Sequence, residues 1–290
     1  MPFDLSKMKV PMKSRGPEID QATADTIKNE LGVFIKRRAK ELSDNLVQAQ
    51  KQVEQTQKVL TSAKKEPARP ASISVAQRSS LAAEQVYQEV RMEYIVFTDS
   101  WKSAKNDKGE MIRYGLDDVI FALKKHPEVI RYTIESSESC GITEFTVRES
   151  GPPDDRLHGS NCLCVYTNDI IITDRSTKWN IGRYKVVIPL ADRASTSDIH
   201  FIPKTVEGYP DYPVNFQHRH MHQRVQRTNV WTCWGSWEGI VGTVLRGRQL
   251  VSLVNIALDF LGKYNSGSPI NRLEQTDVHN RMSFVKRIKA

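Results

Sequence analysis

The sequence predicts an α+β protein, with an antiparallel β-meander flanked by helices and preceded by a long N-terminal helical arm. Three observations support this class. Residues 20–65 contain no proline and one glycine, as a long helix requires. Between residues 129 and 188, β-branched and aromatic segments are separated by turn signals. Leu250–Tyr264 returns to the apolar spacing of a helix. Because helices and strands are grouped, an alternating βαβ arrangement is not favoured.

The arm carries an apolar stripe whose spacing is close to a heptad repeat. Its main positions are Leu42, Leu46, Val53 and Leu60, with weaker positions between them. A lone helix cannot bury such a stripe. We therefore expect the arm to oligomerise or to bind a helical partner. The alternative is that the helix folds back along its own domain.

Composition divides the chain into five segments. The start is polar and irregular, and a Pro/Ala/Ser-rich stretch predicts a linker ahead of the α+β domain. We expect a helix from Ser79 or Ser80, and a short one over Leu116–Lys125. The segments are an irregular basic N-terminus (1–18), a coiled-coil-like arm (19–65), a linker (66–78), an α+β domain (79–272) and a basic tail (273–290).

Composition also bounds the partners. Four cysteines in 290 residues are too few for a disulfide framework, so a reducing, cytoplasmic setting is expected. No apolar run is long enough for a membrane helix, and the first residues do not resemble a secretory signal. The net charge of +8 comes from the two ends, since residues 77–271 are balanced. Solvated ends are favoured, and any nucleic-acid contact there would be non-specific.

Motifs for phosphate loops, dinucleotide binding, nucleophile elbows and zinc proteases are absent from the sequence, and no cofactor is predicted. Alternating histidines share one face of a strand, and cysteines could add thiolates for a metal. This spacing matches no familiar zinc unit, so polar strand surface is favoured and no metal is predicted. The residues concerned are His218, His220, His222, Cys162, Cys164 and Cys233.

A different interpretation makes Cys233 a nucleophile. It stands between Trp231 and Trp234, downstream of the histidines. Nucleophilic cysteine chemistry needs an accessible sulfur and nearby groups that handle protons and oxyanions. The competing interpretation is a buried cysteine packed among tryptophans.

The order of segments around Cys233 points to a family. The chain reads YPDYPVNF over 209–216, then His220 or His222, then Cys233, then NSGSPIN over 265–271. This order resembles the ubiquitin-conjugating (E2-like) family, in a divergent prokaryotic or phage form. The implied fold is the meander with flanking helices shared by ubiquitin-conjugating and RWD-like domains.

The resemblance extends over residues 115–272 and excludes the arm. The sequence departs from the family where the motif histidine is followed by Pro-Asn. Here His220 is followed by Met221, and His222 by Gln223. The strand region is also longer than the family requires, so an extra hairpin is expected.

The resemblance implies a mechanism. An E1-like enzyme would pass a ubiquitin-like protein to Cys233 as a thioester, and an amine would then attack it. His220 or His222 would organise the turn or donate to the oxyanion. Trp231 and Trp234 would form the wall around the sulfur.

Other residues are candidates for binding. Tyr209 belongs to the motif that ends the meander, and Arg224 and Arg227 could receive an anionic tail, although simple solvation is favoured. The alternative function is an inactive E2-like scaffold or assembly protein, in a phage particle or multi-subunit complex, that oligomerises through its arm. In that case Cys233 and the tryptophans are packing or interface residues.

Overall fold

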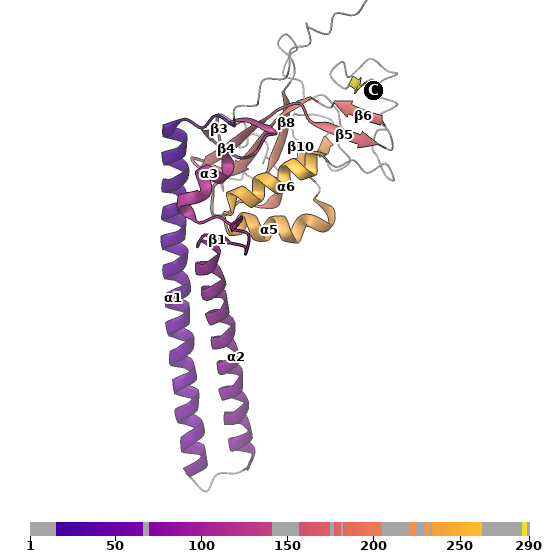
Figure 1. Ribbon diagram of the computed structural model, residues 1–290. Helices are drawn as coiled ribbons and strands as arrows, with labels where there is room; N and C mark the ends of the chain where they lie inside the picture. Colours follow the sequence, from indigo (N-terminus) through magenta and orange to yellow (C-terminus); the bar gives the residue numbers. More distant parts are fainter. Residues whose placement is uncertain are drawn as a thin grey trace, which may run out of the picture. The chain divides into compact units, whose positions relative to one another are not determined.

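The computed structural model contains two compact units, and its elements confirm the α+β class (Figure 1). One unit comprises Lys28–Asp118 and is mainly helical. The other comprises the residues up to Ile27 and those from Val119 onward, and it contains the main sheet. The structure describes residues 16–65, 70–140, 157–174, 177–180, 182–204, 221–223, 230–232, 234–262 and 286–288.

Two long helices form an antiparallel hairpin (Figure 1). Helix α1 (Gln21–Lys65) confirms the predicted arm, and α2 (Pro70–Ser100) returns beside it. Asp20 caps the start of α1, because its Oδ1 accepts a hydrogen bond from the backbone N–H of Thr23 at 2.6 Å. Within the described ranges, no helix combines the length and apolar character that a bilayer crossing requires.

The second helix starts earlier than the sequence predicted. It begins at Pro70 and not at Ser79, so residues 70–78 are helical where a linker was expected. Proline is tolerated at the first position of a helix, where its missing N–H would have no intrahelical acceptor. Residues 79–118, assigned from sequence to the α+β domain, cluster with the hairpin unit.

Contacts between α1 and α2 combine aromatic and charged side chains. Phe34 and Phe97 meet edge to face, with ring centroids 6.1 Å apart. Nearby, Arg38 donates to Glu93 at 2.8 Å. These pairs connect residues far apart in sequence, so they set the alignment of the two helices.

The apolar stripe of the arm lies largely out of solvent within this single chain. Leu42 and Val53 are buried, at 1% and 9% exposure, and Leu46 and Leu60 are half-buried. Since α2 runs beside α1 (Figure 1), the stripe can be covered by folding back. Oligomerisation through the stripe stays a prediction.

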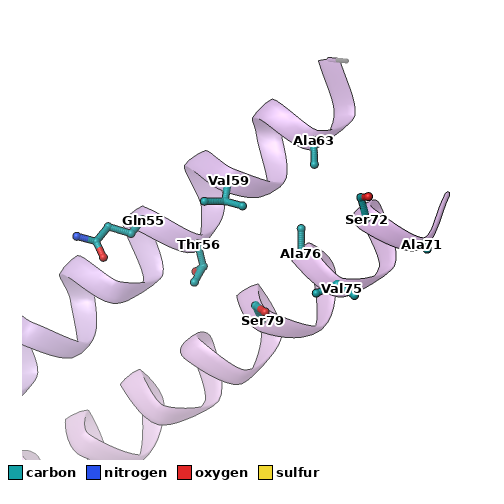
Figure 2. A pocket seen from close by; sticks show the side chains of 9 residues that line it. All are labelled: Gln55, Thr56, Val59, Ala63, Ala71, Ser72, Val75, Ala76 and Ser79. Atoms are coloured by element: carbon teal, nitrogen blue, oxygen red, sulfur yellow. The ribbon is translucent and has the colours of Figure 1, made fainter. Parts of the chain in front are cut away.

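A groove of about 740 Å³ opens between the two helices near the end of the hairpin (Figure 2). Two of its apolar residues, Val59 and Val75, are 60% and 61% exposed. The lining residues are Gln55, Thr56, Val59, Ala63, Ala71, Ser72, Val75, Ala76 and Ser79.

Substitutions of two glycines test how closely residues pack in the hairpin unit. A Cβ on Gly115 would lie 2.7 Å from the Trp101 carbonyl oxygen and 2.8 Å from Ser103 Oγ. We expect Gly115→Ala to lower the free energy of unfolding by about 1–3 kcal/mol through overpacking. In α1, a Cβ on Gly32 would meet only Leu116, at 4.0 Å. Gly32→Ala should therefore raise the free energy of unfolding by about 0.5–1 kcal/mol. Urea unfolding followed by circular dichroism measures both, and equal effects would contradict this packing.

A short β-hairpin follows α2. Strands β1 (Ala104–Lys105) and β2 (Met111–Arg113) pair across a turn that contains Asn106 and Gly109. Asn106 Oδ1 accepts backbone N–H groups within this turn, and Gly109 has φ +77°, a conformation that favours glycine.

The main sheet is an antiparallel meander of order β3-β4-β7-β8. Its strands are β3 (Val129–Ser136), β4 (Asn161–Thr167), β7 (Arg183–Pro189) and β8 (His200–Lys204). One cross-strand row of this sheet is fully buried and consists of Tyr132, Val165, Val186 and Phe201.

A hairpin lies between β4 and β7 in the chain. Strands β5 (Ile171–Asp174) and β6 (Thr177–Asn180) pair with β11 (Lys286–Ile288) in a separate three-stranded sheet. The extra hairpin expected from the E2-like resemblance stays a prediction, as does the resemblance itself.

Helices pack on the face of the main sheet that carries the row from Tyr132 to Phe201. Tyr132 donates its hydroxyl to the Leu123 carbonyl at 3.1 Å, and Phe201 stacks near Phe260 at 5.3 Å. These partners belong to α3 and α6. The helical elements of this unit are α3 (Val119–Leu123), η4 (Thr196–Asp198), η5 (Gly235–Trp237), α5 (Glu238–Arg246) and α6 (Leu250–Gly262), and η2 (Leu116–Asp118) precedes α3 in the chain.

Candidate functional site

Most residues of the predicted catalytic site fall in parts of the chain that the structure does not describe. Their assigned roles therefore stay predictions. These residues are Tyr209, His220, Arg224, Arg227 and Cys233, together with His218 of the alternating series.

Two short strands lie within the segment from Tyr209 to Cys233 that carries these residues. Strand β9 (Met221–Gln223) pairs antiparallel with β10 (Val230–Thr232). Their register sets Trp231 opposite His222 and Thr232 opposite Met221. The ladder thus brings together the backbones of His222 and Trp231, two predicted site residues that are nine positions apart in the sequence.

Trp234 lies in the core. It is 3% exposed, and its ring centroid lies 4.8 Å from that of Phe260 and 5.8 Å from that of Phe201. Its indole N–H donates to the Thr196 carbonyl at 3.0 Å. Trp234 therefore anchors the chain beside Cys233 to the sheet and α6. Of the two roles that the sequence allowed for Trp234, a wall around the Cys233 sulfur or a packing residue, its burial supports packing.

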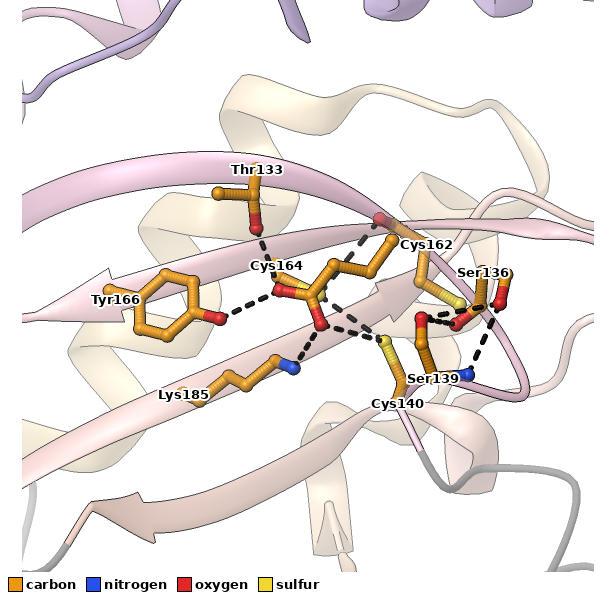
Figure 3. A network of polar contacts seen from close by, with 9 residues as sticks. Thr133, Ser136, Ser139, Cys140, Cys162, Cys164, Tyr166 and Lys185 are labelled. Carbon is orange, nitrogen blue, oxygen red and sulfur yellow. Dashed lines mark hydrogen bonds and ion pairs between the residues drawn. The ribbon is translucent and has the colours of Figure 1, made fainter.

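A cluster that the sequence did not predict lies on the other face of the main sheet (Figure 3). The strand register sets Glu135 opposite Cys162, Thr133 opposite Cys164, and Tyr166 opposite Lys185. Because alternate residues of a strand share a face, these six side chains lie on one side of β3, β4 and β7. Buried Leu157 and Val187 pack around the cysteines.

The Glu135 carboxylate is held by three donors. Its Oε1 accepts hydrogen bonds from the Tyr166 hydroxyl at 2.6 Å and from Thr133 Oγ1 at 2.8 Å. Its Oε2 pairs with Lys185 Nζ at 2.5 Å. Arg131 lies over the Tyr166 ring, 4.3 Å from its centroid. The orientation of the carboxylate is therefore determined from both oxygens.

Cys140 reaches this carboxylate from the turn after β3. Its backbone N–H donates to the Ser136 carbonyl at 3.0 Å, which closes the turn. Its Sγ lies 3.4 Å from Cys164 Sγ and 3.8 Å from Glu135 Oε2. Cys164 and Cys162 are fully buried and Cys140 is 6% exposed. Three buried thiols therefore lie beside the ion pair of Glu135 and Lys185.

The charges of the site follow from these contacts. Burial raises the pKa of Glu135, but hydrogen bonds from Lys185, Tyr166 and Thr133 outweigh it and lower this pKa to about 2. Burial lowers the pKa of Lys185, but its hydrogen bond to Glu135 and the nearby charges of Cys164, Cys140 and Glu135 together outweigh burial and raise this pKa. Both groups are therefore charged at neutral pH.

The thiols divide into one acidic group and two weakly acidic ones. Hydrogen bonds from Cys162 and Cys164 lower the pKa of Cys140, against the effect of burial. The same bonds, with burial, raise the pKa of Cys162 and Cys164. Cys140 is therefore the thiol of the three with the lowest pKa. Within the described residues, Glu135, Cys140 and Cys164 form a set that could hold a metal ion.

The sequence suggested Cys162 and Cys164 only as metal ligands alongside the histidines, and no metal site was predicted. Charged residues within apolar strands could have indicated this cluster. Glu135 and Lys185 each interrupt such a strand, and Cys140 precedes Gly141, a pair that is typical of a turn. Comparisons with protein-family models, with curated proteins and with solved structures find no match to this chain.

Proposed function

We propose that the protein is an E2-like carrier, which takes a ubiquitin-like protein from an E1-like enzyme as a thioester on Cys233 and passes it to an amine. The observation that carries this proposal is the β9–β10 ladder. It ends at the pair Met221 and Thr232, and the next residues along the two strands are His220 and Cys233.

This register favours His220 over His222 as the partner of Cys233. His222 is already paired with Trp231, two residues before Cys233. One further step of the ladder would set His220 opposite Cys233. Directly opposed residues of an antiparallel pair have Cβ atoms about 4.5–5.5 Å apart. An imidazole at that separation can reach a thioester carbonyl.

The buried neighbour of Cys233 supports the same role. Trp234 is tied to Thr196 and to the core, and Thr196 Oγ1 donates to Glu238 at the start of α5. A reactive sulfur gains from a rigid attachment, because oriented groups lower the entropic part of a barrier.

The chemistry balances through two acyl transfers. The Cys233 thiolate attacks the thioester carbonyl of the loaded E1-like enzyme, a new C–S bond forms, and the E1 thiolate leaves. An amine then attacks the Cys233 thioester, the amide forms, the amine proton passes to solvent, and the Cys233 thiolate is released. His220 would donate to the oxyanion of each tetrahedral intermediate.

The proposal predicts an adduct on Cys233. Wild-type protein recovered from its native cells should carry a protein-sized adduct that thiol reductant removes, because thioesters exchange with thiols. Cys233→Ser should carry an ester that resists reductant. His220→Ala should slow discharge to amine by about 10²–10³-fold, the usual cost of one oxyanion donor, and His222→Ala much less. Intact mass spectrometry and single-turnover discharge measure these effects.

Cys162→Ser is the matched control and should leave the adduct unchanged. No adduct on wild type or Cys233→Ser, with the same partners retained by both, would overturn the carrier function. It would support the alternative, an E2-like scaffold. The apolar groove of the hairpin (Figure 2), with its exposed Val59 and Val75, favours that alternative as a surface for assembly with a second copy.

A further inference from the structure

We propose that Glu135, Cys140 and Cys164 bind one thiophilic divalent cation of the zinc type, in a site that is separate from Cys233. The three ligand atoms lie within 4.8 Å of one another. They come from β3, from the turn that follows it, and from β4, so only the folded sheet assembles them.

The distances suit a tetrahedral ion. Zinc binds cysteine sulfur at about 2.3 Å and carboxylate oxygen at about 2.0–2.2 Å, so ligand atoms of a tetrahedral site are about 3.5–3.8 Å apart. Here Cys140 Sγ lies 3.4 Å from Cys164 Sγ and 3.8 Å from Glu135 Oε2. Small movements of the side chains would fit the ion.

The surrounding residues orient the carboxylate as outer-shell partners do. Tyr166 and Thr133 both donate to Oε1, while Oε2 pairs with Lys185 Nζ and lies 3.8 Å from the sulfur of Cys140. A ligand held in this way loses little freedom when it binds a metal.

The charge of the site also fits a divalent ion. Two thiolates and one carboxylate carry three negative charges, which a divalent ion and the Lys185 ammonium together neutralise. Lys185 is 6% exposed, so its charge acts with little screening by solvent. Binding forms two metal–sulfur bonds and one metal–oxygen bond, and releases the remaining thiol protons to solvent.

Cys162 provides a control within the same cluster. It is as buried as Cys164 and lies on the same strand face, but it does not belong to the set of three ligands. A site made only of packed thiols would not distinguish Cys162 from Cys164, whereas the proposed metal site does.

The experiment is a Co²⁺ titration of the full chain, reduced and freed of metal by a chelator. We expect one equivalent to bind with the cobalt–thiolate absorption of a tetrahedral site, and Zn²⁺ to displace it. Cys140→Ser and Cys164→Ser should abolish this absorption, and Glu135→Gln should weaken binding. Tyr166→Phe should lower affinity by about 10–100-fold, as loss of an outer-shell partner does. Circular dichroism verifies that each variant is folded.

Cys162→Ser should retain one equivalent and the wild-type spectrum. The proposal is overturned if the reduced wild type shows no cobalt–thiolate absorption. It is equally overturned if Cys162→Ser loses binding as fully as Cys164→Ser. A third contrary result is a Cys140–Cys164 disulfide in the purified protein that, once reduced, leaves thiols without affinity for Co²⁺ or Zn²⁺.

Discussion

Trp234→Ala should lower the free energy of unfolding by about 3–5 kcal/mol, the range for removing a large aromatic side chain from a core. The ring packs against both Phe201 and Phe260, and because it is only 3% exposed, its removal leaves a cavity. The substitution also leaves the Thr196 carbonyl without its indole donor. Urea unfolding at neutral pH, followed by circular dichroism, measures the loss.

Two further variants separate the causes. Trp234→Phe keeps an aromatic ring but removes the N–H. It should cost about 0.5–1.5 kcal/mol, the net value of one hydrogen bond, because the Thr196 carbonyl still accepts from the Ile199 backbone N–H at 3.3 Å. Ile240→Ala in α5 removes a side chain that is 61% exposed, and should change stability by less than about 0.5 kcal/mol. If Trp234→Ala cost no more than Ile240→Ala, the core placement of Trp234 would be wrong.

Lys185→Met should lower the free energy of unfolding by about 3 kcal/mol at pH 7. Breaking a buried ion pair costs about 3–5 kcal/mol, because it leaves one charge unpaired. The lower end applies here because the Glu135 side chain is still 23% exposed. Metal-free protein should be used, so that the ion pair alone is measured by urea unfolding.

The effect of Lys185→Met should depend on pH. The folded pKa of Glu135 is about 2, below the unfolded value of about 4.3. In the wild type its stabilising effect is therefore complete above about pH 5 and is lost as pH falls toward 2. Without Lys185 the pKa rises, so the carboxyl group can accept a proton when the pH falls. The difference between wild type and variant should therefore shrink between pH 7 and pH 4.

The double variant Glu135→Leu with Lys185→Met is the control. It removes both charges, and should recover most of the stability that the single variant loses. Two results together would show that packing of the lysine stem, and not its charge, explains the loss. The double variant would be as unstable as Lys185→Met, and the stability difference between wild type and Lys185→Met would not shrink at low pH.

The sequence alone predicted α1, α6 and most strands of the meander, in their order along the chain. A stretch without proline predicted α1, and period-two alternation with turn signals predicted the strands of the meander. These signals are local, because each depends on residues within one or two turns or one strand. The wrong start of α2 has the same cause. Neighbouring residues alone do not distinguish a proline at the first position of a helix from a proline within a linker, so Pro70 was assigned to a linker.

The tertiary structure decided which residues meet. Glu135, Cys140 and Cys164 are ordinary residues in the sequence, and only the register of β3 against β4 brings their polar atoms together. The burial of Lys185 follows from the same sheet. In the arm, the stripe fitted a second copy, a partner helix or contact within the chain. The structure shows α2 returning beside α1, and oligomerisation through the stripe stays a prediction. Strand register and helix pairing depend on contacts between distant residues, which local spacing does not encode.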